Sequence, residues 1–481
     1  MRIPLLDGSR IAVVDVPDGG VVLRPPPSDD TIVDVGAAVR DALRFPLAGP
    51  PLEALVRPGG TATVVVEQPS LPIPAAADDP RQEAIAATVD ELEHLGVARI
   101  TILVAGGLHR RLSPSEIAHL VSGEFRRRFR GTVVVHDAEA TDLVDLGRFR
   151  VNPALVETDL VVCVTAAETV LNGGPAALLK ACAPETLRAA GAVSLYETSA
   201  SQGWELALEL ERQLSSRVGV TGVSLTLNVP RVVGEEFLER LAGSRLRVAL
   251  SLLPDAVRTR MVERVPRELT ARAAFGGTPS AAHSEALVRA AGAKGARLDG
   301  PLDAIVIGTP PTTPFFPRER PNPVSAAYLG LGLALRLWRD AFPVRANGTV
   351  ILAHDFRRRF PPPTQTPYRI LFADPRTARD RDAMRDAERA AASDRRAIDE
   401  YRAGRSVHPL HPFVEWSACD ATASRVGSVL IAGCRDAHAA RQLGFVPVHG
   451  LSAALAMARS AGAERIGFLL SPPYFPLLVE S

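Results

Sequence analysis

Lysine is almost absent from this chain of 481 residues. Among its 55 basic residues only Lys180 and Lys294 are lysine, because arginine occupies the other positions. Arginine keeps its proton, whereas a lysine amine can lose its proton and act as a nucleophile. Each lysine is therefore a candidate for chemistry that arginine cannot perform. Lys294 lies in a glycine-rich stretch that we expect to be exposed, so lysine also occurs in this chain without evident chemistry. A purely structural role is therefore the alternative for Lys180.

Cysteine and the common catalytic signatures are scarce as well. The four cysteines are widely spaced and form no CxxC pair, which argues against a zinc ribbon and a dithiol redox site. GxGxxG after a strand, GxxxxGK(S/T), GxSxG and HExxH are all absent. The usual nucleotide-binding, hydrolase and zinc-peptidase classes are therefore not indicated.

The chain also has no excess of positive or negative charge and no long hydrophobic run. The net charge is +1, so neither nucleic acid nor an anionic membrane is an expected partner. The longest apolar stretch, Val324 to Trp338, is short and contains Arg336. The first residues have neither a basic region nor a long apolar segment, as a secretory signal would. We therefore predict a protein without a membrane segment that is kept in the cytoplasm.

Apolar strands alternate with amphipathic helices along most of the chain. In the first series the expected strands are 63–66, 100–104, 132–136 and 160–164, and the expected helices are 79–95 and 113–121. In the second series the expected strands are 303–309, 348–352, 427–431 and 465–470, and the expected helix is 324–340. Strands separated by such helices form right-handed crossovers and mainly parallel sheets.

The length and this alternation predict an α/β protein of two domains. Each domain should be a mainly parallel sheet flanked by helices, with a cleft between the two. We place the boundary in a turn-rich stretch, giving an N-terminal domain of residues 1–298 and a smaller C-terminal α/β domain of residues 299–481 that closes the cleft. The segment 375–403 is predicted to be a charged, solvent-exposed helix, with an oligomer contact as the alternative.

The stretch LVAGGLHRRLSPSE, residues 103–116, is the most informative part of the chain. The apolar residues that open it predict a buried parallel strand, and Gly106 and Gly107 permit a tight turn. Residues 113–116, Ser-Pro-Ser-Glu, are typical of a helix start. His109 is therefore expected at the carboxyl end of a strand, where open α/β sheets bind their ligands.

Other polar residues follow successive strands of the same series. His136 follows one strand, Glu168 follows another, and Asn172-Gly173-Gly174 precedes Lys180. Because the carboxyl ends of parallel strands share one edge of a sheet, we expect these residues in one cleft. We also expect an anion site there, made by Arg110 and by backbone amides, with ion pairing of Arg110 and packing of the glycines as the alternative. The amides are those of Gly106, Gly107, Gly173 and Gly174.

Several segments, taken in order, carry a resemblance to a known family. They are FPLAGPPLEALV (45–56), VVVEQPSLPIP (64–74), AGGLHRRLSPSE (105–116), VVVHD (133–137), DLVDLG (142–147) and RVNPALVETDLVVCV (150–164), with weaker likeness at DAIVIGTPPTTP and GTVILAHDF. Together they resemble the nickel-pincer lactate racemase family, in which a Gly-Thr-His-Arg element stands where this chain has His109-Arg110. The resemblance covers most of the first predicted domain.

The resemblance implies an activity and residues for it. It implies that His109 is a catalytic acid/base and that Lys180 anchors a nickel-pincer mononucleotide, and a modified site of this kind would keep Glu168 as a second catalytic residue. Enzymes of the family take the hydroxyl proton of a 2-hydroxy acid with histidine, pass the C2 hydride to the cofactor and return it to the other face of the ketone. The implied activity is that of an isomerase, a racemase or epimerase.

The chain departs from the family at the expected second base and metal ligand. Where the family has a Glu-Pro-His element this sequence reads Glu168-Thr169-Val170, and the position of the nickel-binding histidine falls near Tyr196. No histidine lies between His136 and His283. Both imidazoles are therefore missing, unless His136, His354 or another residue of the second domain substitutes for them.

Two functions consequently stay open. Further departures are Ser70-Leu71 in place of a family arginine, and the absence of any lysine after Lys294. The first function is a 2-hydroxy-acid racemase or epimerase with a nickel-pincer cofactor. The alternative is a non-catalytic paralogue that binds a nucleotide-like or small anionic ligand, or a protein partner, in the same cleft. The sequence assigns no set of metal ligands.

His408 and His411 are followed by Glu415 and Cys419, which are ligand types for a soft metal. Prolines beside each histidine disturb helical spacing, so we expect an irregular loop here and no metal site. Trp416 is expected either at the cleft or in the core.

Overall fold

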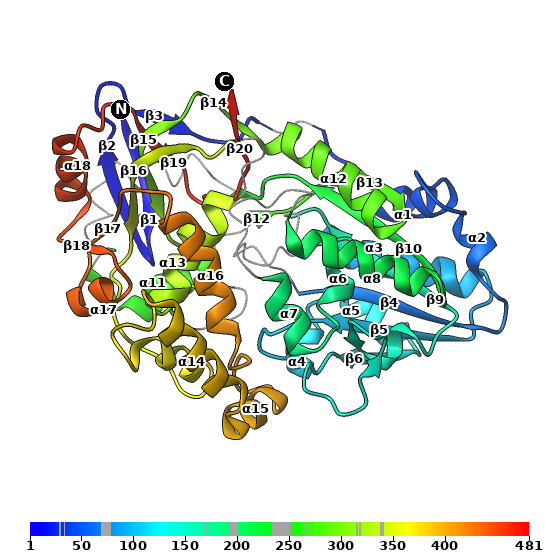
Figure 1. The fold of residues 1–481 in the computed structure, drawn as a ribbon. Coiled ribbons are helices and arrows are strands. Elements are labelled where there is room, and N and C mark those ends of the chain that lie inside the picture. The colour runs from blue at the N-terminus through cyan, green and yellow to red at the C-terminus, as the bar shows by residue number, and fades with distance from the viewer. Residues whose placement is uncertain are drawn as a thin grey trace.

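Two six-stranded sheets organise the protein, as the computed structural model shows (Figure 1). The structure describes residues 1–27, 30–32, 34–68, 78–168, 172–191, 201–232, 250, 252–264, 267–313, 316, 319–336 and 341–480. Helices cover the sheets, and the parallel pairing of most strands confirms the predicted α/β fold class.

The first sheet has the strand order β13-β10-β9-β4-β5-β6. Its strands are β4 (Thr61–Glu67), β5 (Arg99–Ala105), β6 (Thr132–Val135), β9 (Leu160–Ala166), β10 (Gly219–Leu227) and β13 (Ala271–Gly277). All neighbours pair in parallel except β13, which is antiparallel to β10. The carboxyl ends of β4, β5 and β9 therefore lie at one edge.

Helices pack on both faces of this sheet because its central strands are apolar on both sides. In β4 the side chain of Val64 joins a core cluster with α1 (Val35–Arg44) and α3 (Pro80–His94). Its neighbour Val65 points to the opposite face, where α6 (Ala176–Leu179) and α8 (Gln202–Ser215) pack. The helix α12 (Pro279–Lys294) packs along β10 and β13.

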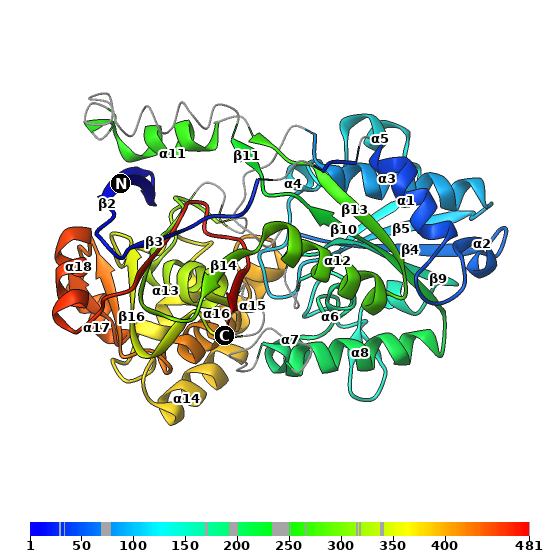
Figure 2. The same ribbon diagram turned by 90° about the horizontal axis from the view of Figure 1, so that it is seen from above.

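The second sheet is entirely parallel, with the order β18-β17-β16-β15-β19-β3. Its strands are β3 (Val21–Leu23), β15 (Leu302–Gly308), β16 (Val344–Ala353), β17 (Ser428–Ala432), β18 (Val446–Val448) and β19 (Ile466–Leu469). The edge strand β3 comes from the N-terminus of the chain. The hairpin of β1 (Arg2–Asp7) and β2 (Arg10–Asp15) joins a core cluster of this sheet, so the first 23 residues lie with it (Figures 1 and 2).

The remaining elements connect or cover the two sheets. The helices are α2 (Leu52–Leu55), α4 (Pro114–Ile117), α5 (Gly123–Arg128), α7 (Pro184–Ala190), α11 (Asp255–Glu263), α13 (Pro323–Ala327), α14 (Arg381–Ala392), α15 (Arg395–Arg402), α16 (His411–Ala423), α17 (Ala437–Gln442) and α18 (Leu451–Ser460). The short strands are β7 (Val144–Asp145), β8 (Arg150–Val151), β11 (Arg231–Val232), β12 (Arg267–Glu268), β14 (Ala296–Asp299) and β20 (Leu477–Glu480).

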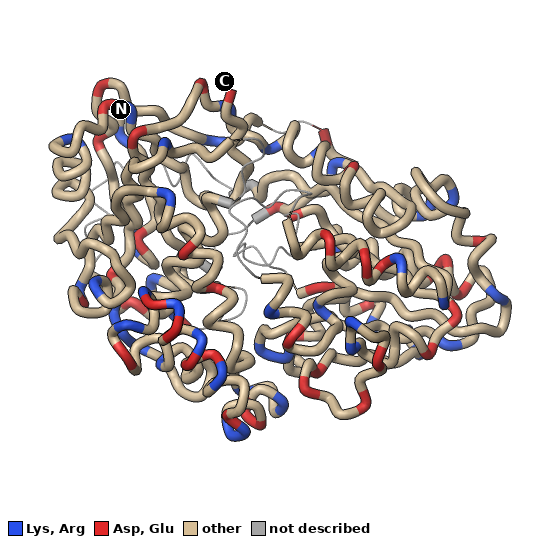
Figure 3. Tube along the Cα trace, in the orientation of Figure 1, with Lys and Arg blue, Asp and Glu red and all other residues tan. Residues whose placement is uncertain are grey.

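Three local predictions need correction. Of the helix expected over 324–340, the described residues 324–336 are α-helical in α13 and continue as a π-helical turn and a short 3-10 turn. In the π-helical turn Gly330 lies so close to Leu352 that a Cβ would clash. The charged segment forms two helices, α14 and α15, because Asp394 caps a new start; both signs of charge alternate along them (Figure 3). The prediction of an irregular loop at 408–411 is wrong for His411, which is the first residue of α16. Pro412 lies in the first turn of this helix, where proline is tolerated.

The predicted division near residue 298 stays a prediction. This position lies within β14, which pairs in parallel with β20 at the other end of the chain. Within the part of the chain that the structure describes, no helix is both long enough and apolar enough to cross a membrane.

Candidate functional site

His109 lies in the loop that leaves the carboxyl end of β5. Gly107 in this loop has a φ of +55°, and its amide donates to the carbonyl of Lys180 at 2.9 Å. The helix α4 then begins with a capping box between Ser113 and Glu116. The strand, the tight turn and the helix start expected here are all present, and together they hold His109 beside Lys180.

A pocket of about 140 Å³ lies next to this loop. Both halves of the chain line it. The first half contributes Gly106, Gly107, Leu108, His109, Asn172, Ala176, Leu179, Lys180, Leu187, Ala190 and Gly191, and the second contributes Tyr328, His411, Val414, Glu415 and Ala418. Apolar side chains form most of the wall, and the polar groups gather at His109, Lys180 and His411.

Lys180 is held at the wall of this pocket by two acceptors. Its Nζ donates to Oδ1 of Asn172 at 2.6 Å and forms an ion pair with Oε1 of Glu67 at 3.1 Å. Burial raises the pKa of Glu67, and the charge of Lys180 opposes that rise. An ammonium group has three hydrogens, so at least one hydrogen is left for a ligand beyond these two partners in the described part of the chain.

His109 faces a second histidine from the other half of the chain. The ring centroids of His109 and His411 are 4.6 Å apart, and the rings meet edge to face at 71°. Burial lowers the pKa of His109 well below 6.5, and the neighbouring His411 and Lys180 lower it further. His109 is therefore neutral near pH 7 and can accept a proton.

Buried polar groups of the second half lie beside His411. Its Nε2 lies 3.2 Å from Oε1 of Glu415, one helical turn along α16. The other oxygen of Glu415 accepts a hydrogen bond from Oγ of Ser325 at 3.1 Å. These groups are buried behind the His411 ring, whose edge-to-face contact is with His109.

The second half of the chain also holds the loop of His109 in place. The hydroxyl of Tyr401 donates to the carbonyl of Gly107 at 3.0 Å and accepts from the amide of Ala138 at 3.1 Å. The amide of His408 donates to the carbonyl of Leu108 at 3.0 Å. The position of His109 thus depends on residues about 300 positions further along the chain.

Other predicted site residues lie apart from this pocket. Arg110 forms an ion pair with Glu116 and donates to two backbone carbonyls. Glu168 pairs with Arg81 at 3.0 Å and lines a separate pocket of about 50 Å³. Gly106 and Gly107 line the main pocket, whereas an added Cβ at Gly173 or Gly174 would lie 2.5 or 2.3 Å from the His283 side chain.

His136 and His354, the two histidines named as substitutes for the missing imidazoles, do not line this pocket. His136 is buried, with Nε2 2.9 Å from the carbonyl of Cys182, and burial lowers its pKa to about 4. His354 lines a different pocket, at the second sheet. Thr169, Val170, Tyr196 and Ser70-Leu71, where the chain departs from the resembled family, lie outside the described residues.

Three further expectations concern single side chains. Trp416 lies in the core, where its ring is 6.0 Å from that of Phe445. Lys294 was expected to be exposed but is half-buried at the end of α12, and burial lowers its pKa to about 8. His408 pairs with Glu139 at 2.9 Å. None of these three side chains lines the main pocket.

The residues of the pocket can be compared with what a nickel-pincer mononucleotide requires. Lys180 supplies an amine, and His109 and His411 supply two imidazoles. Among the described residues, however, no three His, Cys, Asp or Glu side chains gather as a metal site. The volume of about 140 Å³ is also below the roughly 300 Å³ at which pockets for larger ligands begin. These residues fit a small organic anion, and of what the nucleotide requires they supply the amine of Lys180 and the two imidazoles.

Two of the residues that shape the site were not predicted from the sequence. Glu67 is the last residue of β4, and a charged residue ending an apolar strand was a usable signal. His411 had no such signal, because only the packing of α16 against the β5 loop brings it to His109.

Comparisons with known proteins bear on the fold. Residues 9–174 match the family described as the lactate racemase N-terminal domain. The fold is similar to that of the lactate racemase apoprotein from Thermoanaerobacterium thermosaccharolyticum, with a TM-score of 0.63 and 14% identity over 100% of both chains. A protein from Thermotoga maritima is also similar, with a TM-score of 0.53 and 12% identity over 95% of this chain and 100% of its own. No curated protein sequence matches.

Proposed function

Since this chain is lactate racemase-like in its N-terminal sequence and its fold, we propose that its pocket binds a small 2-hydroxy acid. One observation carries the proposal. A neutral imidazole, His109, and an amine with a hydrogen to spare, Lys180, line the same small pocket. The amine suits a carboxylate, and the imidazole suits the neighbouring hydroxyl group.

The size of the pocket supports a small ligand. A volume of about 140 Å³ suits an acid of three or four carbons, and its apolar walls suit a short alkyl group. A carboxylate that accepts the free hydrogen of Lys180 would complete the environment of that ammonium group. Glu67 already balances part of the charge, so we expect modest affinity.

His109 would accept the hydroxyl proton of the bound acid. Its low pKa keeps it unprotonated near pH 7, as a proton acceptor must be. The edge-to-face contact with His411 would hold the His109 ring in place. The chain's own residues thus account for proton transfer at the hydroxyl group.

Racemisation is a second candidate function, and the placement of Lys180 at the pocket wall favours it. The resemblance assigns this lysine to cofactor attachment. Co-expression with the cofactor-synthesis proteins, followed by intact mass and nickel analysis, tests this candidate. Added mass on Lys180 together with nickel would support the racemase, whereas unmodified mass in a protein that still binds 2-hydroxy acids would support the non-catalytic function.

Calorimetric titration tests the binding proposal. At pH 7 we expect lactate and glycolate to bind about tenfold more tightly than propionate, which lacks the hydroxyl group; this factor corresponds to about 1.4 kcal/mol. Lys180→Met should abolish binding, and His109→Gln should remove the preference for the hydroxyl group. Lys294→Met is the matched control, because the second lysine does not line the pocket. Equal binding of propionate, or unchanged binding by Lys180→Met, would refute the proposal.

A further inference from the structure

A second and larger pocket lies at the carboxyl edge of the second sheet. Its volume is about 1220 Å³. Ala353 and Ala432, the last residues of β16 and β17, line it, and so do His449 and Gly450, which follow β18. Ligands of open α/β sheets bind at this edge of parallel strands. The β1–β2 turn and α11 form the opposite wall.

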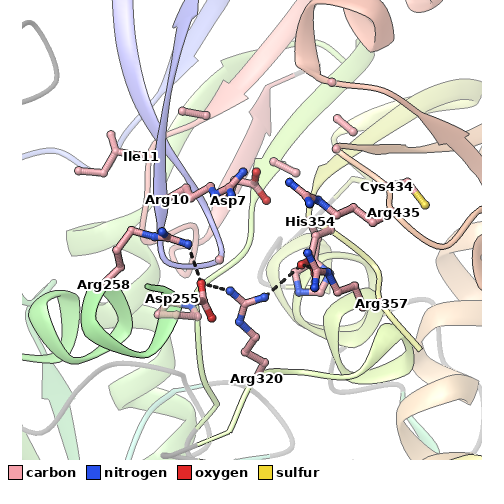
Figure 4. A pocket seen from close by; sticks show the side chains of 18 of the residues that line it. Asp7, Arg10, Ile11, Asp255, Arg258, Arg320, His354, Arg357, Cys434 and Arg435 are labelled. Atoms are coloured by element: carbon pink, nitrogen blue, oxygen red, sulfur yellow. Dashed lines mark hydrogen bonds and ion pairs between the residues drawn. The ribbon is translucent and has the colours of Figure 1, made fainter. Parts of the chain in front are cut away.

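Arginine dominates the charged lining of this pocket, which we name the arginine pocket. The lining contains six arginines and three aspartates. They are Arg10, Arg258, Arg320, Arg357, Arg359 and Arg435, with Asp7, Asp255 and Asp355. The formal charge of the lining is therefore +3, in a chain whose total charge is +1. Figure 4 shows arginines from separate segments directed toward one space.

Two of the aspartates hold three of the arginines in place. Asp255 pairs with Arg258 at 2.8 Å and also with Arg320. Asp355 lies 3.1 Å from both Arg320 and Arg357. These shared carboxylates connect α11 to the loops after β15 and β16, so they fix the guanidinium groups and leave part of their positive charge unbalanced.

The other arginines lack such partners. Within the described part of the chain, no carboxylate lies within 4 Å of Arg10, Arg359 or Arg435. Asp7 lies among them, and burial together with Asp355 raises its pKa to about 6. The amino end of α18, at Gly450 and Leu451, adds the positive end of a helix dipole.

We propose that the arginine pocket binds a phosphorylated small molecule such as a sugar phosphate. Guanidinium groups bind phosphate oxygens in pairs, and several positive groups around one space suit a multiply charged anion. The volume accommodates a ligand much larger than a single phosphate. The lining includes no Phe, Tyr or Trp among the described residues, so nothing in it favours stacking of a nucleobase.

Arg10 and Arg435 are the residues to change, because neither forms an ion pair within 4 Å in the described part of the chain. The double variant Arg10→Gln/Arg435→Gln should weaken binding at least about tenfold and leave the melting temperature unchanged. Arg358→Gln is the matched control, since Arg358 lies in the same loop as Arg357 but does not line the pocket. Asp7→Asn should tighten binding, because it removes a negative charge from the lining.

Calorimetry with inorganic phosphate, pyrophosphate, ribose 5-phosphate and a sugar bisphosphate tests the proposal. We expect the sugar phosphates to bind more tightly than inorganic phosphate, with affinity falling as salt rises. Lys180→Met, in the smaller pocket, should leave this binding intact. The proposal is overturned if none of the four anions binds, if the control and the double variant lose affinity equally, or if Lys180→Met abolishes binding. Weakening by Asp7→Asn would also overturn it.

Discussion

At the scale of single residues, burial and partners decide which histidines can act. Burial lowers the pKa of both His109 and His136, but of the two only His109 lines the main pocket. The ring of His136 is enclosed between the carbonyl of Cys182 and the amide of Asn152. Both histidines follow the carboxyl end of a strand of the first sheet, and what surrounds each ring decides which one can act.

The buried His136 makes stability depend on pH. Its pKa is about 4 in the folded protein and about 6.5 in the unfolded chain. As pH falls from 6.5 to 4, the unfolded chain takes up this proton and the folded protein does not, so stability is lost over that window. The loss is about 1.4 kcal/mol per pH unit, or about 3 kcal/mol in total.

Urea denaturation across this pH range measures the effect. His136→Asn should reduce the slope of unfolding free energy against pH by about 1.4 kcal/mol per unit, whatever its effect on stability at pH 7. The control is His94→Asn at the exposed end of α3, which should keep the original slope. An unchanged slope in His136→Asn would contradict the assignment.

At the scale of elements, one loop connects the site to both halves of the chain. The β5 loop carries His109, while α15 supplies Tyr401 and α16 supplies His411. Because Tyr401 is fully buried and hydrogen-bonded to two backbone groups of the first half, it orders both elements at once. Docking of α15 and alignment of the two histidines are therefore expected to change together.

Tyr401→Phe should expose this coupling. The change leaves the carbonyl of Gly107 and the amide of Ala138 without their partner, at a cost of about 1–3 kcal/mol. Tyr474→Phe is the matched control, because the buried hydroxyl of Tyr474 has no hydrogen-bond partner in the described part of the chain. Urea unfolding should show a loss for Tyr401→Phe and little change for the control. Equal losses would argue against a specific role for Tyr401.

At the scale of the whole molecule, sequence order and spatial order differ. Strand β3 belongs to the sheet that the second half of the chain forms, and the β1–β2 hairpin, a separate two-stranded sheet, packs in a core cluster with it. Leu5 in β1 is 1% exposed and packs in a cluster with Val306 of β15 and Phe468 of β19. The second sheet is therefore incomplete without the N-terminus, wherever the domain boundary lies.

Hydrogen exchange in Leu5→Ala tests this organisation and the predicted domain division together. Removal of this buried side chain should cost about 2–5 kcal/mol. Amides of β15 and β19 should exchange faster, while those of β4 and β9 keep their protection. Val39→Ala in α1 is the reciprocal control, because Val39 is buried against the first sheet. A uniform rise in exchange over both sheets would mean that the two halves unfold as one unit, against a division into two domains.

The local sequence pattern alone determined the fold class and the position of His109. The alternation of apolar strands and helices predicted the α/β class, and the glycine turn with its capped helix start predicted where His109 would lie, because these features depend on neighbouring residues. The scarcity of lysine and the family resemblance pointed to Lys180, and this residue lines the same pocket.

Only the tertiary structure decided the rest. It placed His411 against His109, Glu67 against Lys180, β3 in the second sheet, and arginines from five segments around one space. It also separated Glu168 and Arg110 from the pocket by pairing them with Arg81 and Glu116. Each of these outcomes depends on which residue is nearest once distant segments have packed. The periodicity of a sequence carries no information about such choices.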